Sequence, residues 1–355
     1  MELSEIFFNK WDRPRSGWRV LIFVVINYVL AIALMSLIVI GYYLFPSLWA
    51  RASVQTFLEG LPGWIIQSVV LLTAATVSGF LCAKLLEGLP PRSLGWTLHR
   101  GWAVDWLKGS LIGAVSLALS ALIIFLSGGY KFTFAAYGIG AVLKTLTISG
   151  LVFIIAASAE EALFRGYPLQ TMTRARLAIL GLILTSLVFA YIHRNNPNNP
   201  PGLPPFIYIG LSFVNFPFIN TALAGVWLAV GYLRTRSLWF PLGLHWSWNW
   251  TMGSLLGLPV SGIEALTPAP LLRAADLGPV WLTGGAYGVE GGAACTVALI
   301  VSTIFIWRTR LLSATPLMLS LTDKENPKQS GFPSSKIIEE ESLAGEDRTP
   351  LETNS

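Results

Sequence analysis

Long apolar stretches constrain this 355-residue chain more than any other feature of its sequence. Hydrophobic residues make up 54% of the chain and charged residues only 12%, against roughly 25% charged residues in an ordinary soluble domain. Because backbone in lipid must satisfy its own hydrogen bonds, and no alternating strands of a closed barrel are visible, we expect an all-α, polytopic transmembrane bundle. Eight stretches approach the length of a membrane span, at residues 18–45, 62–86, 106–128, 140–159, 177–193, 213–233, 240–258 and 286–307.

Basic residues alternate between the connections that join these stretches. Every second connection is rich in lysine and arginine, beginning with the segment that precedes the first stretch (Lys10, Arg13, Arg15 and Arg19). This asymmetry predicts that both termini are cytoplasmic. We therefore expect a cytoplasmic N-terminus over 1–17, a transmembrane domain over 18–307, and a polar tail over 308–355 that is disordered because it is charged and poor in aromatic residues.

Three ionisable residues, Glu160, Glu161 and Arg165, follow the fourth apolar stretch within six positions. An ionisable side chain inside a bilayer costs roughly 2.5–3.5 kcal/mol or more and usually marks function. Glu161 and Arg165 are four residues apart, so they share a helix face and can form an ion pair. Glu160 projects about 100° away around the helix and needs another partner. The alternative is that the span ends here and the charges lie at the membrane interface.

Histidine provides that partner. The chain has three histidines, of which His99 stands beside Arg100 in a basic connection and is expected to be a solvated interfacial residue. His193 ends the fifth stretch, and it lies about as far from the turn at 174–176 as Glu160 does, roughly 25 and 21 Å along the two helices. Glu160 and His193 can therefore meet at one level of the bundle.

The third histidine, His245, shares a helix face with Asn249 four residues later. It lies nearer its own cytoplasmic turn, roughly 14 Å along the helix, than Glu160 and His193 lie to theirs. The difference disappears if residues 165–176 form a cytoplasmic extension of the fourth helix.

These residue types predict hydrolysis of a peptide bond. A buried glutamate with a neutral histidine can deprotonate water, and a histidine with an asparagine can donate hydrogen bonds to an oxyanion. The competing chemistry uses Glu160, His193 and His245 as zinc ligands. Other intramembrane protease classes fit less well, because the sequence contains no H-E-x-x-H, no Gly-Asp pair and no G-x-S-x-G.

Three motifs in this order resemble those of the CPBP family (CAAX protease and bacteriocin-processing, or Abi) of membrane endopeptidases, relatives of the type II CAAX prenyl endopeptidase. They are Glu160-Glu161-x-x-x-Arg165, Phe189-x-x-x-His193 and His245-x-x-x-Asn249. Three further segments resemble bacterial members: 234–241 (RTRSLWFP), 257–262 (GLPVSG) and 281–285 (WLTGG). The likeness to the family covers about residues 60–307.

The resemblance implies an all-helical fold with a cavity that opens to the cytoplasmic side. It implies that Glu160 and His193 activate water, that His245 and Asn249 form the oxyanion site, and that Glu161 and Arg165 are a supporting pair. The family has been described as metal-dependent, whereas the glutamate mechanism needs no metal. We expect no cofactor, with zinc on Glu160, His193 and His245 as the alternative.

The resemblance does not name a substrate, because family members cleave after a prenylated cysteine, process or resist bacteriocins, or have none defined. We expect a peptide or membrane-protein substrate, membrane lipids as surroundings, no nucleic acid, and a location in a bacterial inner membrane, where prenylated substrates are not expected. The alternatives are a scaffold of the same fold that does not cleave, for example in bacteriocin immunity, and a transporter. The loop 194–205 is expected to be a surface connection, with a gate as the alternative.

Overall fold

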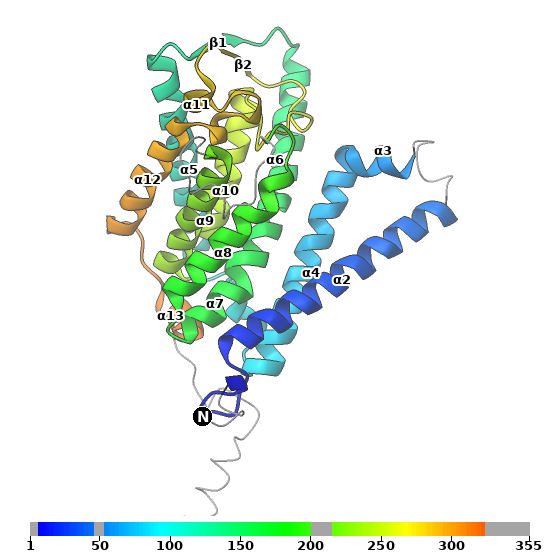
Figure 1. Ribbon diagram of the computed structural model, residues 1–355, viewed down its shortest axis with the longest axis vertical. Coiled ribbons are helices and arrows are strands. Elements are labelled where there is room, and N and C mark those ends of the chain that lie inside the picture. The colour runs from blue at the N-terminus through cyan, green and yellow to red at the C-terminus, as the bar shows by residue number, and fades with distance from the viewer. Residues whose placement is uncertain (1–5, 46–52, 200–214, 324–355) are drawn as a thin grey trace, which may run out of the picture.

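The computed structural model describes residues 6–45, 53–199 and 215–323, and it is a bundle of long helices (Figure 1). Within these ranges, six helices are long and apolar enough to cross a membrane. The predicted all-α polytopic bundle is confirmed, although six rather than eight helices reach that length. They are α2 (Ser16–Leu44), α4 (Leu61–Glu87), α5 (Trp102–Leu126), the continuous run Ile139–Arg174, Ala178–Asn195, and α9 (Phe216–Thr235).

The other two predicted spans form shorter helices. The seventh is α10 (Trp239–Trp250), which continues into the π-helical turn η5 (Thr251–Leu255). The eighth is α12 (Ala293–Arg308), which begins later than expected because glycine-rich turns occupy the first part of the apolar stretch. Gly288, for example, has φ of 93°, a conformation that no helix continues through.

The fourth helix continues well past the charged residues. It runs as α6 (Ile139–Glu161), the π-helical turn η3 (Ala162–Gly166) and α7 (Tyr167–Arg174), before a turn reverses the chain into α8 (Ala178–Ile192). The proposed extension over residues 165–176 therefore forms through Arg174. It removes the mismatch in depth that the sequence left between the α6–α8 pair and α10.

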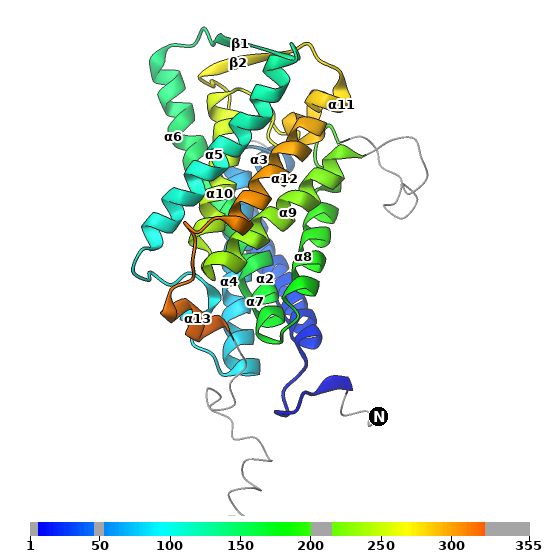
Figure 2. The same cartoon turned by 90° about the vertical axis from the view of Figure 1, so that its left-hand side faces the viewer.

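The helices form two groups (Figure 1). Helices α2, α3 (Val54–Glu59) and α4 diverge from the remaining bundle toward the end where α3 lies. At that same end, strands β1 (Tyr130–Phe134) and β2 (Leu272–Asp276) pair antiparallel, with Tyr130 opposite Asp276. The start of α2 and the short helix α13 (Pro316–Thr322) both lie at the opposite end (Figures 1 and 2). The strand pair was not predicted.

Close packing between α5 and α10 fixes the helix that carries His245. A side chain on Gly113 would overlap Ser247 and the carbonyl of Leu244, and one on Gly243 would overlap the carbonyl of Trp106. Small residues at such crossings let membrane helices approach closely enough for backbone contact. The position of α10 is therefore set by backbone-level packing rather than by flexible side chains.

The connection before α5 is buried, and the prediction of a solvated His99 was wrong. His99 is 3% exposed, and its Nε2 lies 3.3 Å from Ser237 Oγ and 3.5 Å from Asp105 Oδ2. The connection folds onto the start of α10, where the Trp239 indole donates to the carbonyl of Thr97. Sequence neighbours suggested a basic surface, but tertiary packing covers it.

The first part of the predicted tail is also ordered. Residues Pro316–Thr322 form α13, whose N-terminus is capped by the Thr315 hydroxyl and whose Met318 and Leu321 are buried. The prediction of disorder failed here because this segment is apolar enough to pack. The remaining predicted tail, from residue 324, and residues 200–205 of the predicted surface loop lie outside the described residues.

Candidate functional site

A cavity of about 160 Å³ lies among α4, α6, α8, α9 and α10, and we call it the central pocket. Its walls combine apolar and aromatic side chains with polar and charged ones. Small-molecule and peptide sites usually have this character. All four residues predicted to be catalytic line this one pocket: Glu160, His193, His245 and Asn249.

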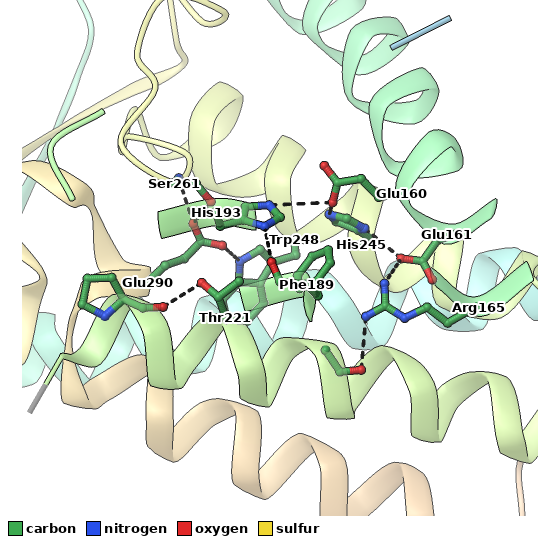
Figure 3. Close-up of polar contacts among 12 residues, drawn as sticks. Glu160, Glu161, Arg165, Phe189, His193, Thr221, His245, Trp248, Ser261 and Glu290 are labelled. Atoms are coloured by element: carbon green, nitrogen blue, oxygen red, sulfur yellow. Dashed lines mark hydrogen bonds and ion pairs between the residues drawn. The ribbon is translucent and has the colours of Figure 1, made fainter. Parts of the chain in front are cut away.

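Glu160 faces both histidines (Figure 3). Its Oε2 lies 3.9 Å from His193 Nε2 and 3.7 Å from His245 Nε2. These separations exceed a direct hydrogen bond, and in the described part of the chain Glu160 Oε2 has no hydrogen-bond partner. The Glu160 side chain is 24% exposed and borders the central pocket. The predicted meeting of Glu160 and His193 is confirmed as geometry.

His193 is held by its own helix turn. Its Nδ1 lies 2.7 Å from the carbonyl oxygen of Phe189, one turn earlier in α8. Because a carbonyl can only accept, Nδ1 carries the proton, and the lone pair of a neutral ring is then on Nε2. The Phe189 ring also packs against the imidazole, with centroids 4.5 Å apart. The spacing Phe189-x-x-x-His193 therefore fixes both ring orientation and tautomer.

Glu161 and Arg165 form the predicted ion pair, fully buried. Arg165 Nη1 donates to Glu161 Oε1 over 3.1 Å, and Nη2 donates to the carbonyl of Gly225 in α9 over 3.1 Å. Gly225 is also a point of close approach between α9 and α8, since a side chain there would overlap Ser186. The Arg165 guanidinium thus connects the end of α6, which carries the two glutamates, to α9.

The sequence did not predict a second contact of Glu161. His245 Nδ1 lies 3.0 Å from Glu161 Oε1, so the carboxylate accepts from Arg165 and His245 together. Glu161 therefore orients the imidazole whose other nitrogen faces Glu160. A carboxylate accepts several hydrogen bonds, so Glu161 could have been expected to have a partner besides Arg165. Spacing within one helix reveals only Arg165, because His245 lies on another helix.

Two of the three site helices change geometry close after the site residues. The π-helical turn η3 directly follows Glu161, and the π-helical turn η5 begins two positions after Asn249. Asn249 itself is half-buried, one turn beyond His245. Single π-helical turns often occur at functional sites because they redirect side chains within a helix.

Glu290 is a polar residue of the central pocket that sequence reasoning missed. Its carboxylate accepts from the Trp248 indole over 2.9 Å, and from the backbone N–H and hydroxyl of Ser261 over 2.8 and 2.7 Å. Glu290 follows segment 281–285, which resembles bacterial family members, and Ser261 belongs to 257–262, another of the three segments with that resemblance. Those two likenesses could have drawn attention to it.

The metal alternative depends on whether three ligands converge. Glu160 lies within 3.9 Å of a nitrogen of each histidine, and both rings donate through Nδ1, which points a lone pair of each neutral ring toward the carboxylate. Across the described ranges, however, no group of three His, Cys, Asp or Glu side chains is arranged to hold a metal ion.

Comparison with known proteins identifies the segment that carries this site. Residues 141–251 match the family model described as type II CAAX prenyl endopeptidase Rce1-like. The match includes every residue of the three motifs and confirms the resemblance that they indicate. No curated protein and no solved structure was found to match. The family match and the six long apolar helices make the chain an integral membrane protein.

Proposed function

Because residues 141–251 match the family model described as type II CAAX prenyl endopeptidase Rce1-like, we propose that the chain is an intramembrane endopeptidase that hydrolyses a peptide bond in the central pocket. One observation carries the proposal: Glu160, His193 and His245 come from three separate helices and meet at the wall of this pocket. A carboxylate and two imidazoles around one point can supply the general base and the hydrogen-bond donors of amide hydrolysis.

Glu160 and His193 activate the attacking water. The separation of 3.9 Å between Glu160 Oε2 and His193 Nε2 suits a water that bridges the carboxylate and the imidazole nitrogen. Glu160 accepts the proton as the water attacks the carbonyl carbon, and His193 Nε2 orients the same water through its lone pair. The protonated Glu160 then returns the proton to the amine that leaves, so no covalent intermediate with the enzyme forms.

His245 and Asn249 stabilise the oxyanion. They project from one face of α10 into the central pocket, where an imidazolium Nε2–H and a carboxamide N–H can donate to the developing charge. Glu161 supports this role, because its carboxylate beside Nδ1 stabilises the imidazolium form and fixes the ring. Arg165 holds Glu161 in place in turn.

The zinc alternative names Glu160, His193 and His245, the same residues. The mechanism above uses only side chains of the protein, and no step of it is routed through a metal. Dialysis of the purified protein against a strong chelator separates the two mechanisms. Activity that survives in metal-free buffer supports the glutamate mechanism, and activity that is lost and then restored by zinc supports the metal mechanism.

The orientation in the membrane is part of the proposal. The start of α2 and the region after α12 lie at one end of the bundle, and basic residues gather before the first helix and at the end of the last. This distribution supports cytoplasmic termini. We place the protein in a bacterial inner membrane, with a peptide or membrane-protein substrate.

The test uses the full chain purified in detergent and a broad peptide library analysed by mass spectrometry. Wild-type protein is compared with Glu160→Ala and His245→Ala, each checked for an unchanged elution profile. We expect cleavage products from the wild type that neither variant generates. If the wild type gives no product beyond those of the variants, the chain binds or scaffolds rather than cleaves.

A further inference from the structure

Two glycine-containing segments outside the catalytic motifs, residues 257–262 and 284–292, meet at the central pocket. The backbone N–H of Gly262 donates to the carbonyl of Tyr287 over 2.9 Å, and Ser261 donates twice to Glu290. A side chain on Gly288 would overlap the carbonyl of Pro259, so only glycine permits this approach. The result is one wall of the pocket, with Glu290 as its charged residue.

Glu290 has only neutral partners. Its oxygens accept from the Trp248 indole and from Ser261, so both act as acceptors in the pattern of a carboxylate. In the portion of the chain that the structure describes, no Lys, Arg or His nitrogen lies within 4.0 Å of these oxygens. The negative charge is therefore solvated by dipoles but lacks a counter-charge.

The surroundings strengthen the field of this charge. Glu290 shares the central pocket with apolar side chains such as Trp227, Leu266 and Leu299. A charge beside low-dielectric walls is screened less than one at an open surface, and it attracts a cation into the concave space. Figure 3 shows Glu290 and Glu160 on opposite sides of His193, and both line the central pocket. A peptide bound beside Glu160 in this pocket can therefore extend to Glu290.

We propose that Glu290 forms a subsite for a lysine or arginine side chain of the peptide substrate. The Glu290 carboxylate is a specificity-determining group outside the matched family segment, and it selects substrates that carry a cationic residue near the scissile bond. A carboxylate only accepts hydrogen bonds, whereas ammonium and guanidinium groups only donate, which makes them complementary. The inference depends on the proposed endopeptidase function for its place in catalysis, but the binding site itself can be tested without cleavage.

The binding test uses full-length Glu160→Gln protein, so that no peptide is consumed. The probes are end-blocked apolar heptapeptides in pairs, which carry lysine or norleucine at one position, with that position moved along the peptide. Intrinsic fluorescence of the pocket tryptophans reports the dissociation constants. We expect the best lysine peptide to bind roughly tenfold more tightly than its norleucine partner.

Variants of the same wall identify the group responsible. Adding Glu290→Gln is expected to bring the lysine-to-norleucine ratio to about one. Ser261→Ala is the matched control, because it removes one hydrogen bond to Glu290 and leaves the charge, so the ratio should persist. If Glu290→Gln does not fold, the wild-type ratio in low and high salt replaces it, since salt weakens only the ionic part.

The outcomes separate this inference from the proposed function. Equal binding of the paired peptides, no binding of either, or a ratio unchanged in Glu290→Gln overturns the cationic subsite. Wild-type cleavage of peptides without a lysine or arginine preference also overturns it, while the endopeptidase function stands. A lysine preference in binding without any cleavage supports the subsite and contradicts the endopeptidase.

Discussion

Two glutamates of this protein, Glu87 and Glu160, have opposite surroundings, and the contrast separates structural from catalytic charge. Glu87, at the end of α4, is 2% exposed and receives three short contacts: Arg19 Nη1 at 3.1 Å and Arg174 Nε and Nη2 at 2.9 Å each. Glu160 is 24% exposed, and its nearest basic nitrogens are 3.7 and 3.9 Å away. The Glu87 carboxylate thus has short contacts to two guanidinium groups, whereas the Glu160 carboxylate lies beyond hydrogen-bond distance of both histidine nitrogens.

The difference follows from what each position does. Glu87 connects α2, α4 and α7 through two guanidinium groups, and a buried ion pair of this kind tolerates no gap because each lost contact leaves an unpaired charge. Glu160 borders a pocket, where space beside the carboxylate admits reactants. We infer that incomplete pairing next to a cavity distinguishes the reactive carboxylate from the structural one.

Substitution of Glu160 tests the reactive side of the comparison. Glu160→Gln should lower the cleavage rate about 10³-fold, within the range for removal of a general base. Because Glu160 lies too far from either histidine nitrogen for a hydrogen bond, the thermal unfolding midpoint should stay the same or rise. Cleavage of an identified peptide and thermal unfolding in one detergent measure both effects. A large fall in the midpoint would show that Glu160 is a structural charge.

Substitution of Glu87 should give the reverse pattern. Glu87→Gln leaves Arg19 and Arg174 without their carboxylate and should cost about 3–5 kcal/mol of stability, as breaking a buried pair does. The unfolding midpoint should fall steeply, while the cleavage rate per folded molecule, measured well below that midpoint, should not change. A loss of activity in the fully folded protein would contradict a purely structural role.

The same contrast explains what could be predicted from the sequence. The pair Glu161–Arg165 and the orientation of His193 depend on positions four apart in one helix, which sequence spacing reveals directly. The contact between Glu161 and His245 joins residues 84 positions apart, and its existence depends on how α6 and α10 cross. Local geometry provides the candidates, and packing decides their second partners.

The fold was predictable to the same degree. Hydropathy identified the helices, because each must satisfy its backbone within lipid. The pairing of β1 with β2, the buried His99 and the packed α13 depend on contacts between distant segments, which no local pattern encodes. Glu87 was missed for the same reason, since its two arginines come from other helices.

Glu161 combines features of Glu87 and Glu160, because its carboxylate binds both the structural residue Arg165 and the site residue His245. Glu161→Gln should lower the cleavage rate about 10–100-fold, the usual effect of losing a carboxylate that orients a functional imidazole. It should also reduce stability, since Arg165 loses its counter-charge. The double variant Glu161→Gln with Arg165→Gln should recover stability without recovering activity. Recovery of both would show that Glu161 acts only through Arg165.

The smallest expected effects come from exchanging arginine for lysine in each network. Arg174→Lys loses the fork that contacts both oxygens of Glu87 and should cost about 1–2 kcal/mol of stability with no change in cleavage rate. Arg165→Lys keeps the charge beside Glu161 but loses the bond to Gly225, at a similar cost in stability. Unlike Arg174, Arg165 holds a carboxylate that also binds His245, so its exchange should slow cleavage several-fold. Equal cleavage rates in the two variants would show that the position of Glu161 does not depend on the guanidinium group of Arg165. The contact with His245 would then be enough to hold the Glu161 carboxylate in place.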